Sequence, residues 1–425
     1  MPSLGFHVTN VLTAGLSHVL GMRCVKCDVF YPTDCGHLVC PDCGSDGILD
    51  VVLDYEAIQS RITREALAAN PDPTHWRYAP LLPLVNPERR PPLAVGGSPL
   101  YSFATLAEML GVNELLVKDD GLNPTASLKD RASSVGVAKA LEVGAKVITC
   151  ASTGNAASSL AGAAASVGLE AHIFVPARAP EAKVAQLLIF GAHVYVVEGT
   201  YEQAFDLSMA CAEHLGWYNR NSGINPYLVE GKKTVGLEIA EQTDWNPPDW
   251  VFASVGDGCS IFGLWKGLRE AHELGLTHSV PRVVGVQASG AAPIVAAAMS
   301  GEDLVPIEPD SLADSIAVGT PRNWRKALRA VEASEGKWLT VTDDEILGAM
   351  RTLGSRAGVF GEPAGVTAFA GAVKAAHLGM IGANDRVAVV VSGNGLKDVA
   401  NAVKATGQAR RVEPDVEALM RELKR

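Results

Sequence analysis

The sequence has no apolar run of about 18 residues, the length that a membrane-spanning helix requires. Residues 1–22 also lack the cationic start and the long apolar core of a secretion signal. Acidic residues outnumber basic ones, with 47 Asp and Glu against 36 Lys and Arg, and the net charge of −11 leaves no basic footprint for nucleic acid. We therefore expect a cytoplasmic protein with neither a membrane nor a nucleic acid as its partner.

The sequence also lacks the common signatures of a catalytic metal site and of a dinucleotide-binding loop. The ten histidines form no H-x-x-H or H-E-x-x-H pair, which argues against a catalytic metal. The glycine-rich residues 254–260 lack the G-x-G-x-x-G spacing of a dinucleotide-binding loop. What remains is a chain of 425 residues with 48% apolar content, enough for two or three packed domains.

Cysteine is concentrated near the start, with five of the eight cysteines in residues 24–43. Four of them form two C-x-x-C units with twelve residues between them, and such units place four thiolates at the corners of a tetrahedron. Cys35 and His37, between the units, are possible substitute ligands, and reduced thiols in a metal-free hairpin are the other interpretation. The spacing predicts a zinc ribbon whose ligands are Cys24, Cys27, Cys40 and Cys43.

The rest of the chain is organised around residues 119–131, which read Asp-Asp-Gly-Leu-Asn-Pro-Thr-Ala-Ser-Leu-Lys-Asp-Arg. An expected strand over residues 115–118 leads through a turn into a helix that begins at Lys129. A partly desolvated lysine near the positive end of a helix dipole has a lowered amine pKa, so more of it is free to attack an aldehyde. Lys129 is a candidate Schiff-base lysine, and the alternative is a solvated lysine in a charged turn.

Three further strand-to-helix loops supply partners for an aldehyde cofactor. In residues 152–155 (Ser-Thr-Gly-Asn), N–H groups and hydroxyls can hold a carboxylate, and Asn155 can donate to a phenolate-type oxygen. In residues 254–260, glycines let backbone amides close around a phosphate. The third loop follows an expected buried strand over residues 386–391 and begins with Ser392, whose hydroxyl can meet a ring nitrogen. An amine, a carboxylate loop, a phosphate loop and a ring-nitrogen partner are together the inventory of a pyridoxal phosphate (PLP) site.

These motifs resemble those of the threonine synthase family, part of the tryptophan-synthase-β-like (fold type II) PLP enzymes. Residues 123–131 are similar to the family's N-P-T-G-S-F-K-D-R, residues 152–155 to its S-T-G-N, and residues 392–398 to its T-G-H-G-L-K-D. Residues 96–100 (Gly-Gly-Ser-Pro-Leu) are similar to its G-G-T-P-L. The resemblance extends over nearly the whole chain.

The resemblance implies a role for each motif. Lys129 is the catalytic lysine that holds the cofactor as a Schiff base, Asn155 contacts the cofactor's O3′, and Ser392 faces its pyridine nitrogen. The cofactor's phosphate is held by Gly256, Asp257, Gly258, Cys259 and Ser260. The residues expected to bind a small amino-acid substrate are Ser152, Thr153, Asn221, Ser222 and Lys232. A homodimer is expected as well.

The order of expected elements predicts an α/β fold. Strand-like runs alternate with helical ones, as in parallel sheets covered by helices, at residues 146–150, 171–175, 193–197, 250–253, 283–287 and 386–391. Such sheets bind ligands beyond the carboxyl ends of their strands, where Ser152, Gly256 and Ser392 fall. With the resemblance, we predict a fold type II PLP enzyme that has two doubly wound parallel-sheet domains with the cofactor between them and a small N-terminal zinc ribbon. The predicted bounds are 20–50 for the ribbon, 51–128 and 230–425 for the large PLP-binding domain, and 129–229 for the small substrate-loop domain.

The choice of substrate turns on residues 219–234. They resemble the family's N-S-x-N-P-[YH]-R-L-E-G-Q-K-T, whose asparagine, serine and arginine are associated with the phosphate of O-phosphohomoserine, but Leu228 stands at the arginine position. An arginine fork gives a phosphate several charge-assisted hydrogen bonds, whereas leucine offers none. Arg220, Lys232 and Lys233 are the nearby cations that can restore the charge.

Three functions are therefore compared. The leading one is threonine synthase, which converts O-phospho-L-homoserine and water into L-threonine and phosphate by PLP-dependent β,γ-replacement. The second is β-elimination or β-replacement on serine, threonine or phosphoserine, as in a dehydratase or a cysteate-synthase-like enzyme, which needs no γ-phosphate pocket. The third is a non-enzymatic zinc-ribbon interaction protein, for which Lys129 and its three companion loops have no use.

Overall fold

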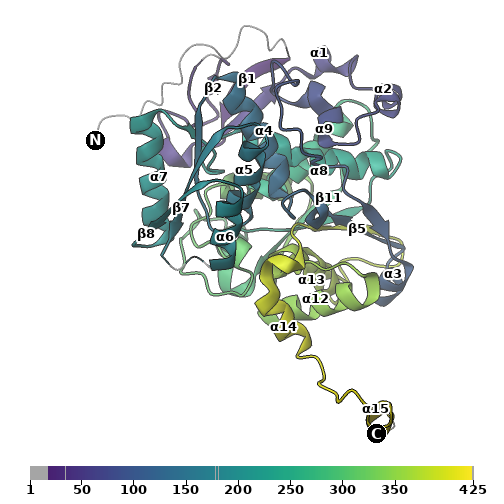
Figure 1. Cartoon of the computed structure of the whole chain (residues 1–425). Coiled ribbons are helices and arrows are strands. Elements are labelled where there is room, and N and C mark those ends of the chain that lie inside the picture. Colours follow the sequence, from purple (N-terminus) through teal and green to yellow (C-terminus); the bar gives the residue numbers. More distant parts are fainter. Residues whose placement is uncertain (1–17, 34, 178, 180, 424–425) are drawn as a thin grey trace.

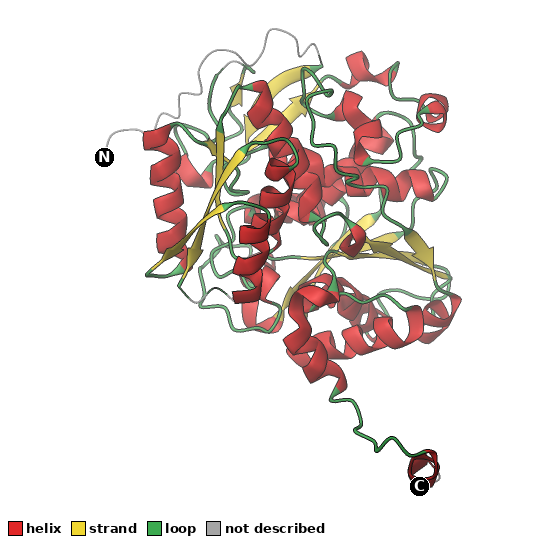
Figure 2. Cartoon of the chain, viewed as in Figure 1, coloured by secondary structure: helices red, strands yellow, loops and turns green. Residues whose placement is uncertain are grey.

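The computed structural model describes residues 18–33, 35–177, 179 and 181–423, and its strands form three sheets (Figures 1 and 2). The residues before 18, on which the expected lack of a secretion signal mainly rests, lie outside the described part. The small first sheet has the order β2-β1-β3, with β1 (Val19–Cys24), β2 (Phe30–Tyr31) and β3 (Leu49–Leu53) all antiparallel.

The largest sheet has six strands in the order β12-β11-β10-β13-β5-β4, and only β4 runs antiparallel to its neighbour. Its strands are β4 (Leu100–Ser102), β5 (Glu114–Asp119), β10 (Trp250–Ser254), β11 (Arg282–Ala288), β12 (Lys337–Val341) and β13 (Arg386–Val391). Alternate residues of a strand point to opposite faces, and both faces are buried here. Val389 packs toward α12 (Asp343–Ala357) and α13 (Pro363–His377), whereas Val390 packs toward α8 (Tyr227–Gln242) and α9 (Cys259–Glu273).

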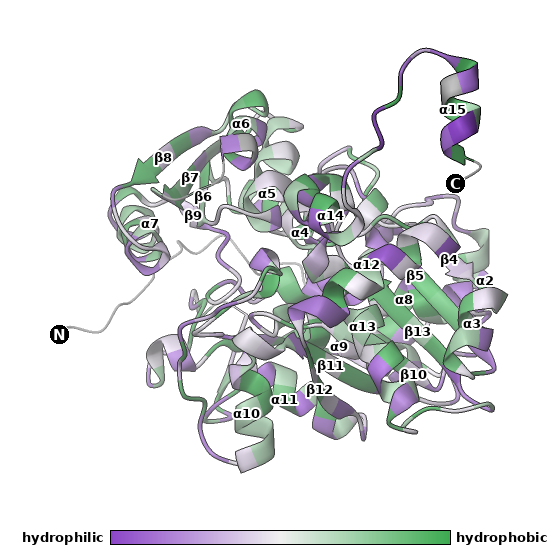
Figure 3. Cartoon of the chain, turned by 90° about the horizontal axis from the view of Figure 1, so that it is seen from below, coloured by the Kyte–Doolittle hydropathy of each residue, from purple (hydrophilic) through white to green (hydrophobic). Residues whose placement is uncertain are grey.

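The four-stranded sheet is parallel throughout, in the order β8-β7-β6-β9. Its strands are β6 (Val147–Ala151), β7 (Glu170–Pro176), β8 (His193–Val197) and β9 (Tyr218–Asn219). Figure 3 shows this sheet with α7 (Tyr201–Leu215) on one side and α5 (Asn155–Ala165) and α6 (Glu181–Ile189) on the other. Ile173 packs with Leu160 of α5 on one face, and Phe174 packs with Phe205 of α7 on the other.

Helices connect the strands and cover the sheets. The α-helices are α1 (Tyr55–Gln59), α2 (Arg64–Ala69), α3 (Ala104–Leu110), α4 (Lys129–Glu142), α5 (Asn155–Ala165), α6 (Glu181–Ile189), α7 (Tyr201–Leu215), α8 (Tyr227–Gln242), α9 (Cys259–Glu273), α10 (Pro293–Ser300), α11 (Trp324–Ala333), α12 (Asp343–Ala357), α13 (Pro363–His377), α14 (Val399–Thr406) and α15 (Val416–Leu423). The 3-10 helices are η1 (Gly44–Asp46), η2 (His75–Leu81), η3 (Asp120–Leu122), η4 (Ser289–Ala291), η5 (Asp314–Ile316) and η6 (Gly395–Asp398). None of the described helices combines the length and the apolarity that crossing a membrane demands.

The expected α/β fold is confirmed, and each strand expected in the two parallel sheets is present to within about one residue at either end. The sequence interpretation missed β4, β9 and β12. β4 and β9 are too short to show a hydrophobic period, and β12 contains the polar Lys337 and Thr340. The domain bounds, the homodimer and the cytoplasmic location stay predictions.

Candidate active site

The loops after β5, β10 and β13 line one cavity at the carboxyl ends of these strands. The Leu128 N–H donates to the carbonyl of Ser392 (2.9 Å), and Ser127 forms a β-bridge with Gly393, so the lysine loop and the Ser392 loop are held together. The cavity and its open mouth together enclose about 700 Å³. Its polar lining includes Lys129, Ser222, Lys232, Asp257, Ser260, Ser315 and Ser392.

Lys129 is the first residue of α4 and lines this cavity. Burial lowers the pKa of its amine to about 8, nearby Lys232 and Arg220 lower the pKa as well, and Glu362 opposes them. Within the described part of the chain, its Nζ has no hydrogen-bond or ion-pair partner. The lowered pKa expected from the sequence is therefore present, and its main cause is burial.

The N-terminus of α9 has the features of an anion-binding site and lies in the same cavity. The backbone N–H groups of residues 256–261 donate to no acceptor among the described residues, and they lie at the positive end of a 15-residue helix. The loop requires its glycines: a Cβ at Gly256 would lie 2.8 Å from the Cα of Ile316, and Gly258 has a φ of +97°. The side chain of Asp257 accepts from the Arg322 N–H (2.7 Å) and from Asn323 Nδ2 (2.5 Å), so it fixes the loop.

The second helix terminus, at α5, carries the Ser-Thr-Gly-Asn motif. Ser152 Oγ accepts from the Gly154 N–H (3.2 Å), while the N–H groups of Thr153, Asn155 and Ala156 have no acceptor in the described structure. The buried Asn155 donates from Nδ2 to Glu362 Oε1 (2.7 Å). This terminus can hold a carboxylate group.

Glu362 was missed by the sequence interpretation. It precedes α13, is fully buried, and its pKa is raised by burial, against which the hydrogen bond from Asn155 and the charges of Lys397 and Lys129 act. A Cβ at Gly393 would lie 2.3 Å from its Oε1, which places the carboxyl group directly behind the Ser392 loop. One glutamate before a helix-starting proline has no local pattern that would mark it.

The predicted substrate residues are only partly brought together. Ser222 and Lys232 line the cavity with Lys129, whereas Ser152 and Thr153 lie at the α5 terminus and are not part of the cavity lining. Asn221 is buried, and its Oδ1 accepts from the Ala151 N–H (3.0 Å), so its side chain anchors the end of β6. The substrate roles of these residues stay predictions.

The three cations proposed near Leu228 have different surroundings. Lys233 is neutralised, because its Nζ donates to Glu230 (2.6 Å) and to the Leu81 carbonyl (2.8 Å) and also pairs with Glu270 (2.8 Å). Lys232 is buried and lines the cavity, yet no carboxylate or carbonyl of the described residues contacts its Nζ.

Arg220 is also buried, and no carboxylate in the described part of the chain pairs with it. Its Nε and Nη2 donate to Ser133 Oγ (3.1 and 3.0 Å), and Nη1 lies 3.5 Å from the oxygen of Ser222, a cavity-lining residue. Leu228 is itself fully buried, and its Cδ2 would lie 2.8 Å from a Cβ at Gly136, so its side chain fills the contact between α8 and α4.

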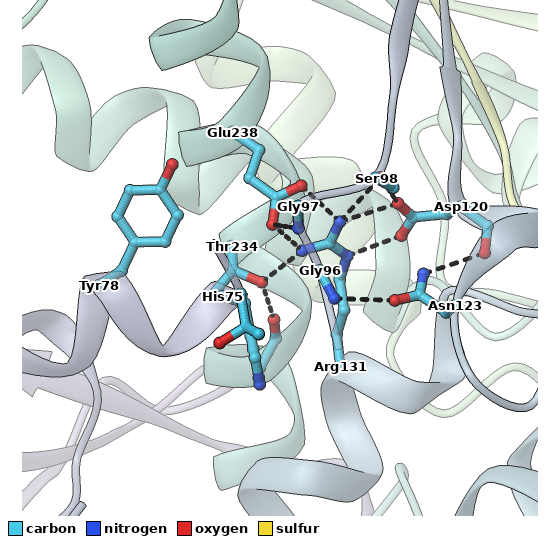
Figure 4. Close-up of polar contacts among 12 residues, drawn as sticks. His75, Tyr78, Gly96, Gly97, Ser98, Asp120, Asn123, Arg131, Thr234 and Glu238 are labelled. Carbon is cyan, nitrogen blue, oxygen red and sulfur yellow. Dashed lines mark hydrogen bonds and ion pairs between the residues drawn. The ribbon is translucent and has the colours of Figure 1, made fainter. Parts of the chain in front are cut away.

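A buried ion cluster around Arg131 fixes the start of α4 (Figure 4). Arg131 bonds both oxygens of Asp120 (2.7 and 2.8 Å) and both oxygens of Glu238 (2.6 and 2.7 Å). Lys118 adds a contact to Glu238 (2.7 Å), and Ser98 donates to Asp120 (2.5 Å). The two cations and two carboxylates balance, and they hold Lys129, two residues away, in place.

The four cysteines of the two C-x-x-C units form one cluster. The sulfur atoms of Cys24, Cys27, Cys40 and Cys43 all lie within 4.8 Å of one another. The Lys26 and Cys27 N–H groups point at Cys24 Sγ (3.4 and 3.5 Å), and neither Cys35 nor His37 belongs to the cluster. Four thiols at this spacing suit a tetrahedral metal ion.

Comparison with known proteins agrees with this geometry. Residues 92–393 match the family model described as pyridoxal-phosphate dependent enzyme. The chain is 38% identical to threonine synthase of Methanocaldococcus jannaschii over 405 residues, which are 95% of this chain and 99% of that protein. It is 39% identical to threonine synthase of Methanosarcina acetivorans over 402 residues, 94% of this chain and 97% of that protein.

The chain belongs to the threonine synthase family of pyridoxal-phosphate dependent enzymes. Solved structures of the same fold include a processed threonine deaminase isoform 2 from Solanum lycopersicum, with a TM-score of 0.63, 24% identity, and coverage of 73% of this chain and 87% of that one. A diaminopropionate ammonia lyase from Escherichia coli has a TM-score of 0.64 at 19% identity, with the same coverage. This member of the threonine synthase family thus has the fold type II architecture predicted from its sequence, and it is a PLP-dependent lyase.

Proposed function

We propose that the chain is a threonine synthase, which converts O-phospho-L-homoserine and water into L-threonine and phosphate. The observation that carries the proposal is a cavity lined by two kinds of anion-binding group: the N–H groups of residues 256–261 and the amine of Lys232, none of which has an acceptor among the described residues. A phosphorylated cofactor and a phosphorylated substrate need one set each. Full-length relatives named threonine synthase support the same conclusion.

The cavity residues fit PLP. The glycine-dependent terminus of α9 would hold the phosphate group, the Ser392 hydroxyl would meet the pyridine nitrogen, and the Lys129 amine is the group that would join the aldehyde. Asn155, held by its hydrogen bond to Glu362, is the proposed donor to the ring oxygen. When bound, the cofactor supplies an electron sink for negative charge on the α-carbon of the substrate.

Lys129 is also the proposed proton carrier. An amine pKa of about 8 lies close to neutral pH, where one group both accepts and returns protons efficiently. Its amine is free to move because no described residue binds Nζ, while the ion cluster around Arg131 fixes the backbone from which the side chain extends. In the proposed reaction, Lys129 removes the α-proton and then transfers protons at Cβ.

The substrate carboxylate is assigned to the terminus of α5. Its free N–H groups at Thr153, Asn155 and Ala156, together with the hydroxyls of Ser152 and Thr153, form a donor set for one carboxylate. The terminus lies beside the wall of the cavity, since a Cβ at Gly154 would lie 3.7 Å from the hydroxyl of the cavity-lining Ser315.

Lys232 and Arg220 are assigned to the leaving phosphate. An unpaired buried cation destabilises the folded state, by about 3–5 kcal/mol when one partner of a buried pair is removed. An anionic substrate that pairs with the cation recovers this free energy. The charge on a departing phosphate grows, so both cations bind the transition state more strongly than the ground state. Ser222 lies between Arg220 and the cavity and completes the donor set.

The main alternative is β-elimination or β-replacement on serine, threonine or phosphoserine. Serine and threonine carry no γ-phosphate, so neither uses a second cation in the cavity. Lys232 and Arg220, buried without carboxylate partners among the described residues, therefore favour a phosphorylated substrate over serine or threonine, and the assay below distinguishes O-phosphohomoserine from phosphoserine. A non-enzymatic role is excluded by membership of an enzyme family that extends over the cavity and Lys129.

We also propose that the cysteine cluster binds one structural zinc ion and is a zinc ribbon. Its four thiols leave no coordination position for a substrate, and Cys24 and Cys40 are fully buried. The following strand is tied to the core by buried ion pairs, in which Lys266 contacts both Asp50 (3.0 Å) and Glu230 (2.7 Å). These contacts support a structural role for the ribbon, as an appendage of the large sheet.

One panel assay tests the proposed reaction. The purified, PLP-loaded chain is incubated in parallel with O-phosphohomoserine, serine, threonine and phosphoserine while phosphate, keto acid and threonine are measured. Threonine and phosphate in equal amounts from O-phosphohomoserine, with little keto acid from the others, are expected. Phosphate release from O-phosphohomoserine no faster than without enzyme, combined with keto acid from serine or threonine, would establish the alternative.

A further inference from the structure

Three side chains at the start of two neighbouring strands form a cluster far from the cysteines in sequence. Glu170 and His172 are the first and third residues of β7, and His193 is the first residue of the edge strand β8. The two strands are parallel with His172 opposite His193, and residues two apart in a strand point to the same face. The register therefore brings both imidazoles and the carboxylate to one side of the sheet.

The ligand atoms are close enough to share one ion. Glu170 Oε1 lies 2.8 Å from His172 Nε2 and 3.3 Å from His193 Nε2, and all three ligand atoms lie within 4.8 Å of one another. Ligands at zinc-type bond lengths on a tetrahedral ion are separated by roughly 3.4 Å. The two separations from Glu170 Oε1 lie within roughly 0.6 Å of this spacing.

His172 is held in the orientation that a metal ligand needs. Its Nδ1 is 2.8 Å from the Tyr195 hydroxyl, which leaves Nε2 directed toward Glu170, and its ring lies between His193 (centroids 4.6 Å apart) and Trp217 (4.2 Å). Such a hydrogen bond on the second nitrogen is the usual support of a metal-bound histidine. His193 and Glu170 have side chains 55% and 50% exposed, so an ion reaches them from solvent.

We propose that Glu170, His172 and His193 form a second metal site, which binds a zinc-like divalent ion with water in the fourth position. Two imidazoles and one carboxylate suit zinc, copper or nickel better than magnesium or calcium, which prefer oxygen ligands throughout. The site lies at the amino ends of β7 and β8, whereas the cofactor cavity lies at the carboxyl ends of the strands, so the proposal does not depend on the proposed reaction.

Zinc stoichiometry of the full chain tests the proposal directly. Equilibrium dialysis of wild type against Zn²⁺ is compared with His193→Ala and Glu170→Gln, both at exposed positions where folding is preserved. His214→Ala, on the exposed end of α7 in the same part of the chain, is the matched control. We expect His193→Ala to bind one zinc fewer than wild type, Glu170→Gln to bind it at least tenfold more weakly, and His214→Ala to be unchanged. Comparing variants keeps this result independent of the cysteine cluster.

Trp217 offers a second readout, because Cu²⁺ quenches an indole within a few ångströms. Titration with Cu²⁺ should quench wild type and His214→Ala but not His193→Ala, and Trp217→Phe should retain the additional zinc while losing the quenching. Equal zinc stoichiometry in wild type and His193→Ala would overturn the proposal, and so would a loss of zinc in His214→Ala as large as that in His193→Ala.

Discussion

Lys129 and Lys233 show how strongly position alters the same side chain. Lys233 is paired with Glu230 and Glu270 and does structural work, whereas Lys129 faces a cavity with no partner among the described residues and has a pKa of about 8. Burial disfavours the charged form of an amine unless a carboxylate compensates for it. Both lysines lie in helices, Lys129 at the start of α4 and Lys233 within α8. Only the groups packed around each amine distinguish a reactive lysine from a structural one.

The lowered pKa of Lys129 makes a pH-dependent prediction. The amine is neutral above its pKa, so the rate at which apoprotein captures PLP should rise with pH and level off above about pH 8 rather than near the ordinary value of 10.5. Stopped-flow absorbance at several pH values measures this rate. Lys129→Ala should show no covalent capture, and borohydride reduction of wild type followed by peptide mapping should label Lys129. A label on another lysine would refute the assignment.

Glu362 is predicted to act through Asn155. Glu362→Ala removes the acceptor of the 2.7 Å hydrogen bond and frees the Asn155 amide to turn, so PLP affinity should fall by about tenfold, the effect of one lost hydrogen bond of roughly 1.5 kcal/mol. Glu362→Gln keeps an acceptor oxygen and should restore the affinity and the absorbance maximum of the bound cofactor. Equal losses in the two variants would show that the carboxylate charge, not the orientation of Asn155, is what matters.

Among the elements, α4 and α8 supply the two lysines of the cavity, and the two helices approach each other closely. A Cβ at Gly231 would lie 2.0 Å from the Arg131 carbonyl, so glycine is required where the two helices touch. The same contact brings Lys129 of α4 and Lys232 of α8 to one cavity. The ion cluster of Figure 4 supports this pair of helices from behind, since Arg131 lies on α4 and Glu238 on α8.

Arg131→Met tests that support. The change leaves Asp120 and Glu238 buried with only Lys118 to balance them, so the free energy of unfolding should fall by about 3–5 kcal/mol. Urea denaturation followed by circular dichroism measures the loss. Arg386→Met, which breaks a partly exposed pair with Glu114 and a hydrogen bond to the Asn246 carbonyl, is the control and should cost less, about 1–2 kcal/mol. Similar losses in both variants would contradict the role given to the cluster.

The ribbon makes a prediction of its own. The chain purified under reducing conditions should contain about one zinc at the cysteine cluster, and Cys40→Ser should lose it, because three thiolates leave an open coordination position. Activity should survive in part, since none of the four cysteines lines the cavity. Cys211→Ser, outside the cluster, is the control for general loss of a thiol. Retention of this zinc by Cys40→Ser would contradict the assignment.

For the whole molecule, local sequence patterns were sufficient for most of the fold. Continuous apolar runs such as residues 386–391 predicted the buried parallel strands, and the position of Ser392 after such a run predicted its place at the edge of the cavity. Long-range contacts were not predictable in this way. The pairing of Asn155 with Glu362 spans about 200 residues, and the neutralisation of Lys233 depends on Glu270 in another helix.

The choice of substrate also depends on long-range contacts that local sequence patterns do not predict. The sequence showed that Leu228 replaces an arginine and offered three cations in its place, but only packing distinguishes them. Leu228 is buried against Gly136, and Lys233 is paired, which leaves Lys232 at the cavity and Arg220 behind Ser222. We therefore propose that this cavity accommodates two phosphate groups, one of them bound by Lys232.

The most direct test is the kcat/KM of Lys232→Met and Lys232→Arg for O-phosphohomoserine, measured with the PLP dissociation constant of each variant. We predict a fall of about 100-fold for Lys232→Met, the loss of a charged hydrogen bond of roughly 3 kcal/mol, with unchanged PLP affinity, and a smaller loss for Lys232→Arg. A kcat/KM for Lys232→Met within twofold of wild type would contradict the claim. So would a fall that is fully explained by weaker PLP binding, since Lys232 would then serve the cofactor's phosphate.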